Sequence, residues 1–177
     1  MYLKITSNLL KSFFLLTFLS SCGGTYLVVP TPQDVNPDRV VDIKLNNKIK
    51  IINIQQSKTN VPIGVLSFVN HEANLNEWTN KSIQLLKSEL KKRGGIVSED
   101  GLKVLSLSVL SAHVETRSMG SGTRCNLTIH VKAGDEYSTD ISVVNNAGIG
   151  VDRPAGGAIT LAITELLNDE KILNYLR

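Results

Sequence analysis

The chain has 177 residues, of which 42% are hydrophobic and 20% charged, with 19 lysines and arginines against 16 aspartates and glutamates. A net charge of only +3 excludes the strongly basic balance of a typical nucleic-acid-binding protein. The one basic cluster falls at the end of a predicted helix, where cations suit the helix dipole: Lys87, Lys91, Lys92 and Arg93. We therefore expect no nucleic-acid partner.

The chain begins with the pattern of a secretory signal. Lys4 and Lys11 precede an apolar run over residues 12–21, and small residues surround Cys22 at its end. The run is shorter than the about 20 apolar residues that a permanent membrane span needs. We predict a signal peptide over residues 1–21, and its removal would leave 17 basic against 16 acidic residues, because Lys4 and Lys11 leave with it.

The sequence Leu19-Ser-Ser-Cys22-Gly23 resembles the lipobox of bacterial lipoproteins. The resemblance implies cleavage before Cys22 and acylation of its thiol and its new amine. Each buried CH₂ of such a lipid contributes about 0.8 kcal/mol, so several chains hold a protein on a membrane almost permanently. Gly23 in place of an aspartate implies, by the same resemblance, the outer membrane and a domain that faces the periplasm. The alternative is a soluble secreted protein that carries a cysteine at this point by chance.

Residues 22–39 have the composition of a lipidated tether, with two glycines and the prolines Pro30, Pro32 and Pro37. A segment of this kind is semi-extended, at about 3 Å per residue, and could hold a domain roughly tens of ångströms from a membrane. The apolar patch at residues 26–29 could instead dock on the domain. We expect one compact domain over residues 40–177.

Alternating apolar residues predict two strands early in this domain. The alternation covers residues 41–45 and then 49–54, and Asn46-Asn47 between them favours a turn, so the two strands are expected to form a hairpin. A further β-rich run covers residues 61–69.

The most regular pattern is a helix that begins after Asn74 and ends at Gly94-Gly95. Asn74 is a candidate N-cap with Glu77 three residues later, and the glycines favour a helix end. One stripe at helical spacing holds the apolar residues Leu75, Trp78, Ile83, Leu85, Leu86 and Leu90. Two polar residues, Ser82 and Glu89, also fall inside it. We expect Trp78 to pack in the core rather than to bind a ligand.

Three successive strands are predicted between Lys103 and Asn145, as an antiparallel meander with one buried face. The alternation changes phase at Val109-Leu110, which predicts a β-bulge that moves Leu110, Ala112 and Val114 to the buried face. Downstream, Asp152 and Pro154 fit the first turn of a helix, and Asp169 can cap a short final helix.

These elements predict an α+β fold: an antiparallel β-sheet with two main helices packed on one face, plus a short C-terminal helix. The second main helix carries small residues between Ala155 and Ala162, which let it approach its neighbour closely. A groove lined by them between the helices and the sheet would favour a lipid-handling role.

No motif predicts catalysis. The histidines His71, His113 and His130 have no third ligand at a recognisable spacing, so we expect no metal site and no cofactor. Cys125 with His113 or His130 could form a nucleophilic pair, but no helix N-terminus lies behind the cysteine to activate it. A buried structural cysteine is the preferred interpretation, and a disulfide to another chain is the alternative.

The order of lipobox, tether, strand, capped helix, strand meander and C-terminal helix resembles the small YajG-type envelope lipoproteins. It is more loosely similar to the auxiliary lipoproteins of envelope transport, and the ending Asp169-Glu-Lys-Ile-Leu-Asn-Tyr-Leu176 is part of the resemblance. The resemblance implies a membrane-anchored, non-enzymatic binding, assembly or structural factor of the outer membrane. Its partners would be membrane lipid, through acylated Cys22, and an envelope protein.

Two alternatives belong to other functional classes. The first is an auxiliary subunit of a lipid or lipopolysaccharide transport system. The second is a hydrolase that uses Cys125 as its nucleophile.

Overall fold

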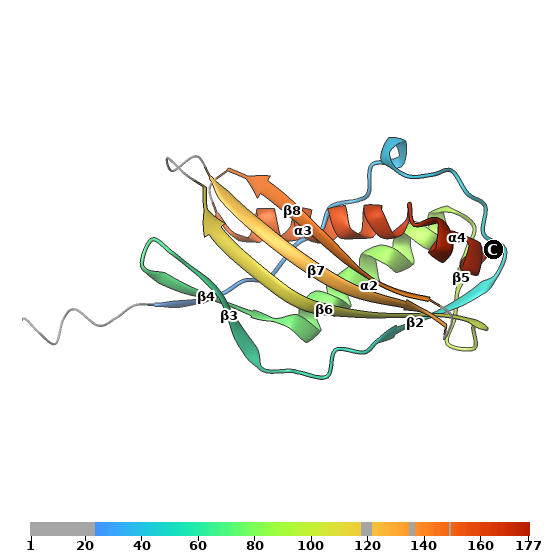
Figure 1. The fold of residues 1–177 in the computed structure, drawn as a ribbon, viewed down its shortest axis with the longest axis horizontal. Helices are drawn as coiled ribbons and strands as arrows, with labels where there is room; N and C mark the ends of the chain where they lie inside the picture. Colours follow the sequence, from blue (N-terminus) through green and yellow to red (C-terminus); the bar gives the residue numbers. More distant parts are fainter. Residues whose placement is uncertain (1–23, 118–121, 135–136, 149) are drawn as a thin grey trace, which may run out of the picture.

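The computed structural model describes residues 24–117, 122–134, 137–148 and 150–177, and it confirms the predicted α+β fold (Figure 1). A five-stranded sheet has the order β5 (Ile96–Val97), β2 (Lys48–Asn53), β6 (Lys103–Thr116), β7 (Thr123–Ala133), β8 (Tyr137–Ala147). A three-stranded sheet has the order β1 (Thr25–Leu27), β4 (Val69–Asn74), β3 (Asn60–Leu66). The helices are α2 (Leu75–Lys92), α3 (Asp152–Leu166), α4 (Glu170–Leu176) and the 3₁₀ turn η1 (Pro37–Arg39).

Strands β6, β7 and β8 form the predicted antiparallel meander. Alternate residues of β7, from Thr123 to Ala133, are buried and the others are partly exposed, as expected for a strand with one face on the core. The register of β6 against β7 shifts between Val109 and Ser111, which confirms the bulge. The bulge returns Val114 to the buried face, where it lies opposite Cys125. The expected burial of Leu110 is wrong, because Leu110 is 48% exposed, and Ala112 is only partly buried.

Helices α2 and α3 lie side by side on one face of the larger sheet (Figure 1). The Asn74 side chain accepts a hydrogen bond of 3.1 Å from the Glu77 amide, which confirms the predicted N-cap. Gly94 ends α2 with φ +84°, and the Gly95 amide donates to the Leu90 carbonyl at 2.9 Å. Asp169 caps α4 through the amides of Lys171 and Ile172.

The predicted antiparallel hairpin of residues 41–45 and 49–54 is wrong. Strand β2 pairs in parallel with β6 and with β5, so the larger sheet is mixed rather than antiparallel. Ile43 and Leu45 are buried, but they lie outside the strands, because an extended loop can bury alternate residues without joining a ladder. The expected turn residue Asn47 instead donates from Nδ2 to the carbonyl of Leu176, at the C-terminus.

The β-rich run at residues 61–69 contains a turn that the sequence analysis missed. Strands β3 and β4 form a hairpin in which Leu66 pairs with Val69, so Ser67 and Phe68 are the two loop residues. This hairpin and β1 form the smaller sheet, which packs on β6 beyond the end of β2. Gly64 of β3 lies against the Val114 backbone, where there is no room for a side chain.

Residues 25–39, the N-terminal strap, pack on the domain, although the whole segment falls within the predicted tether of residues 22–39. Val28 and Val35 are buried, and the Val28 amide donates to the Glu72 carbonyl at 2.8 Å. Thr160 of α3 donates to the Gln33 carbonyl and accepts from its amide. The expected spacer of tens of ångströms is therefore absent from the described part of residues 22–39. The apolar patch at 26–29 docks through the pairing of β1 with β4 and the burial of Val28, while its other three residues stay more than 40% exposed.

The small residues of α3 face the core and the strap, so they leave no groove. Ala155, Ala158 and Ala162 are at most 1% exposed. At Gly156 the backbone of Thr31 lies where a Cβ atom would project. These small residues therefore line no groove. The hollow that does lie between α3 and β8, of about 520 Å³, is lined by larger side chains, among them Leu161, Glu165 and Val143.

Candidate functional site

The one predicted site residue, Cys22, lies outside the described residues. The structure does show where the residues after Cys22 join the domain. Gly24 is the first described residue, and its carbonyl accepts a hydrogen bond of 3.1 Å from the Asn70 amide. Strand β1 then runs parallel to β4, with Thr25 opposite Asn70 and Leu27 opposite Glu72. The chain therefore enters the fold at the start of β4, next to the β3–β4 turn.

A hollow of about 570 Å³ lies at the same end of the molecule, and we call it the Tyr26 pocket. It is bordered by the strap, the β3–β4 hairpin, the end of β6 and the start of α3. Its lining includes the apolar side chains of Leu66, Val69 and Val151 and the polar side chains of Tyr26, His71, Thr123 and Asp152. Most of the surface exposed in this hollow is apolar, and polar side chains border it, which suits a molecule with an apolar part and a polar group.

Tyr26 and Asp152 form a hydrogen-bonded pair on the polar side of the Tyr26 pocket. The Tyr26 hydroxyl donates to Asp152 Oδ2 at 2.6 Å, and Asp152 Oδ1 accepts from the Val29 amide at 3.2 Å. The hydrogen bond to Asp152, its negative charge and burial raise the pKa of Tyr26, so the hydroxyl stays protonated. The Tyr26 ring lies 5.6 Å from that of His71, whose Nδ1 is 2.9 Å from the Val69 carbonyl oxygen. These contacts fix the strap to α3 and to β4 of the smaller sheet.

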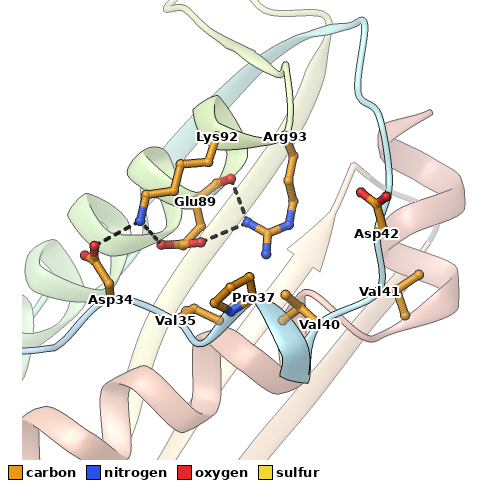
Figure 2. A pocket seen from close by; sticks show the side chains of 9 residues that line it. All are labelled: Asp34, Val35, Pro37, Val40, Val41, Asp42, Glu89, Lys92 and Arg93. Atoms are coloured by element: carbon orange, nitrogen blue, oxygen red, sulfur yellow. Dashed lines mark hydrogen bonds and ion pairs between the residues drawn. The ribbon is translucent and has the colours of Figure 1, made fainter.

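A second hollow, of about 450 Å³, lies between the strap and the end of α2 (Figure 2). Glu89 is 1% exposed there, and its two carboxylate oxygens accept from Lys92 at 2.7 Å and from Arg93 at 2.8 Å. Lys92 also reaches Asp34 of the strap at 3.1 Å. We call these four residues the Glu89 cluster.

Electrostatics explain how a buried carboxylate is tolerated in the Glu89 cluster. Burial raises the pKa of Glu89, but hydrogen bonds and charge from Lys92 and Arg93 outweigh that effect and hold the pKa below its usual value. Both carboxylate oxygens are engaged, so the cluster has no free acid for proton transfer. Its position joins α2 to the strap, which is a structural role.

The Glu89 cluster was missed by the sequence analysis, although a signal was present. A glutamate inside an apolar stripe is expected to be buried, so its carboxylate needs a cation nearby. Lys92 and Arg93 are cations three and four positions later, which places them on the same side of the helix. Ser82, the other polar residue of the stripe, is also buried and donates to the Trp78 carbonyl at 2.9 Å. Trp78 itself packs in the core, as predicted.

The structure separates Cys125 from the histidines. Cys125 is fully buried on the helix-facing side of β7, and burial raises the pKa of its thiol to about 12. His113 and His130 are on the other face of the sheet, where His130 Nδ1 lies 2.6 Å from Asp140 Oδ1. His71 belongs to the smaller sheet. A Cys–His pair is therefore not formed, and the thiol is held in its unreactive form.

The described residues contain neither a cluster of metal ligands nor a membrane-spanning helix. No three histidine, cysteine, aspartate or glutamate side chains in that part of the chain converge as metal ligands. None of the described helices is long and apolar enough to cross a bilayer.

The sequence matches no family model and no curated protein. The fold is similar to the crystal structure of protein XCC0632 from Xanthomonas campestris, assigned to the family DUF330, with a TM-score of 0.51. The similarity covers 86% of this chain and 95% of that one at 11% identity. A crystal structure titled as a neuraminyllactose-binding hemagglutinin homolog from Helicobacter pylori also matches, with TM-score 0.35 and 14% identity over 83% of this chain and 96% of that one. The first match shows a shared fold; neither assigns a function.

Proposed function

We propose that the chain is a lipid-anchored, non-enzymatic lipoprotein of the bacterial outer membrane that binds or helps to assemble an envelope partner. The observation that carries the proposal is the signal-like segment that ends at Cys22, followed within two residues by the folded domain. An acylated Cys22 would hold the domain directly at the lipid surface. The buried, high-pKa thiol of Cys125 supports a role without cysteine catalysis.

The anchor is tested by intact-mass spectrometry of the protein from membrane fractions. The expected product begins at Cys22 and carries the mass of its acyl chains, and a Cys22→Ala chain remains unprocessed and unacylated. An unacylated wild-type chain, or one cleaved elsewhere, overturns the proposal. Crosslinking of the lipidated protein in living cells then identifies the partner, and separation of inner from outer membranes tests the location.

A second candidate function, an auxiliary subunit of lipid or lipopolysaccharide transport, is favoured by the Tyr26 pocket. This hollow is mostly apolar and lies where the chain leaves for Cys22. The transport candidate predicts that purified wild-type protein carries a lipid, detected by mass spectrometry, and that Val69→Asp in the pocket lining removes it. Leu102→Asp is the matched control, because Leu102 is 92% exposed and does not line the pocket.

A further inference from the structure

The tip of the β3–β4 hairpin presents an aromatic side chain to solvent. Phe68 is 94% exposed, and Val65 on the same hairpin is 64% exposed. Both loop residues have positive φ, 48° at Ser67 and 66° at Phe68. Two-residue turns with this geometry strongly favour Asn-Gly, because other side chains are strained there. Neither the packing nor the backbone of the domain therefore accounts for a phenylalanine at this position.

The chain leaves toward Cys22 at the same tip. Since β1 is parallel to β4 and Gly24 bonds to Asn70, the N-terminal end of β1 lies beside the residues that follow the turn. Figure 1 shows β1 and the hairpin tip at one end of the molecule, with α4 and the C-terminus at the other. Two residues of chain reach at most about 7 Å, so Cys22 cannot be far from this tip.

We propose that the β3–β4 hairpin tip inserts into the lipid interface beside acylated Cys22, with Phe68 as the inserted side chain and Val65 next to it. The inference rests on the proposed lipid anchor. An aromatic ring suits the interfacial region of a membrane. An anchor only two residues before Gly24, which bonds to Asn70 beside the turn, would keep the ring close to the membrane. Two contacts, the acyl chains and the hairpin, would fix the orientation of the domain instead of letting it swing on one point.

The other end of the molecule supplies a matched control. Leu102 is 92% exposed, and its neighbour Lys103 lies over the ring of Tyr175 in α4. Strand β6 begins there and ends at Thr116, which lines the Tyr26 pocket. A strand of 14 residues spans roughly 45 Å, so Leu102 is far from the hairpin tip although it is equally exposed.

The test uses the full, natively lipidated chain, reconstituted into vesicles of phosphatidylethanolamine and phosphatidylglycerol that contain brominated phosphatidylcholine. Tryptophan fluorescence is compared among Phe68→Trp, Val65→Trp and Leu102→Trp, with the wild-type signal of buried Trp78 subtracted. We expect the emission of Phe68→Trp to shift to shorter wavelength and to be quenched most by bromines near the headgroup, because interfacial residues lie roughly 5–10 Å deep. Val65→Trp should show a weaker quenching, and Leu102→Trp none.

The outcomes separate this inference from the proposed function. If the chain is acylated and floats with the vesicles but Phe68→Trp and Val65→Trp are quenched no more than Leu102→Trp, the hairpin inference is overturned and the anchor stands. A wavelength shift without bromine quenching means that protein covers the tip, which also overturns the inference. If the wild-type chain carries no acyl group and does not float, the anchor itself fails, and the hairpin inference fails with it.

Discussion

The indole nitrogen of Trp78 donates a hydrogen bond of 3.1 Å to the backbone carbonyl of Val28, 50 residues earlier in the chain. Trp78 is 1% exposed, and the bond ties the first long helix to the N-terminal strap. Trp78→Phe removes the donor and leaves a buried carbonyl without a partner. We expect a loss of about 1–3 kcal/mol in the free energy of unfolding, measured by circular dichroism in urea. Leu102→Ala is the control and should change nothing; an equal effect of both substitutions would contradict this account.

The Glu89 cluster predicts a pH-dependent contribution to stability. We expect Glu89→Gln to lower the free energy of unfolding at pH 7 by about 2 kcal/mol, because the hydrogen bonds from Lys92 and Arg93 are charge-assisted. The pKa of Glu89 in the folded state is below its ordinary value of 4.5. Its contribution is therefore complete above pH 4.5 and is lost as the pH falls through the folded-state value.

The difference in the free energy of unfolding between wild type and Glu89→Gln should accordingly become smaller at acid pH. Urea denaturation at a series of pH values from 7 to 3 measures it. Glu165→Gln, at an exposed position of α3, is the control. A difference that is constant from pH 7 to pH 3 would contradict the assigned electrostatics.

The hairpin turn predicts that a substitution can stabilise the fold. A left-handed backbone conformation costs a residue other than glycine about 1–2 kcal/mol, and Phe68→Gly removes that cost. Glycine also has more freedom in the unfolded chain, which lowers the stability by about 0.5–1 kcal/mol. We expect a net increase of up to about 1 kcal/mol, read from thermal and urea denaturation. Leu102→Gly removes a similarly exposed side chain without a positive φ and should not stabilise. Equal effects at both sites would show that the turn stores no strain.

The strap approaches α3 so closely at Gly156 that we expect a larger residue there to lower the stability. Gly156→Ala places a methyl group against the Thr31 backbone, so either the strap or the helix must move, at about 1–3 kcal/mol. Limited proteolysis within residues 25–39 should become faster as the strap is displaced. Gly148→Ala is the control, because a Cβ there meets nothing within 4 Å. Unchanged protease resistance in Gly156→Ala would mean that the strap does not depend on this contact.

Cys125 should be unreactive in the folded protein. Its thiol is fully buried with a pKa near 12, so alkylation requires opening of the fold and should follow its unfolding rate. The measurement is mass spectrometry of the peptide that contains Cys125 after timed exposure to iodoacetamide, with and without urea. Leu102→Cys supplies an exposed thiol as a control for the reagent. Rapid labelling of Cys125 in native protein would reopen the possibility of a cysteine nucleophile.

The sequence predicted correctly the features that depend on residues close together in the chain. The cap at Asn74, the helix end at Gly94, the bulge after Val109 and the cap at Asp169 each depend on residues a few positions apart. The parallel pairing of β2 depends instead on β6, which lies some 50 residues away in sequence, and nothing near Ile49 specifies its partner. The alternation at residues 41–45 predicted burial correctly and strand pairing incorrectly, because alternation reports a buried face and not a hydrogen-bonded neighbour.

The candidate site was the least predictable part. Tyr26 and Asp152 are 126 residues apart, and neither belongs to a recognisable motif. Proline content favoured a spacer over residues 22–39, yet Val28 and Val35 find buried positions that only the assembled helices provide.

The strap also has a consequence for the order of folding. Its hydrogen bonds join Gln33 to Thr160, 127 residues later, and Arg39 to Asn168, 129 residues later. The earliest part of the domain therefore docks on α3 and on the residues that follow it. If the chain is exported from its N-terminus, residues 25–39 reach the far side of the membrane long before α3 does. We expect the strap to stay extended until synthesis and export are nearly complete. The segment around Cys22 would then remain accessible to processing enzymes during export, and docking of the strap would bring the domain down to the membrane afterwards.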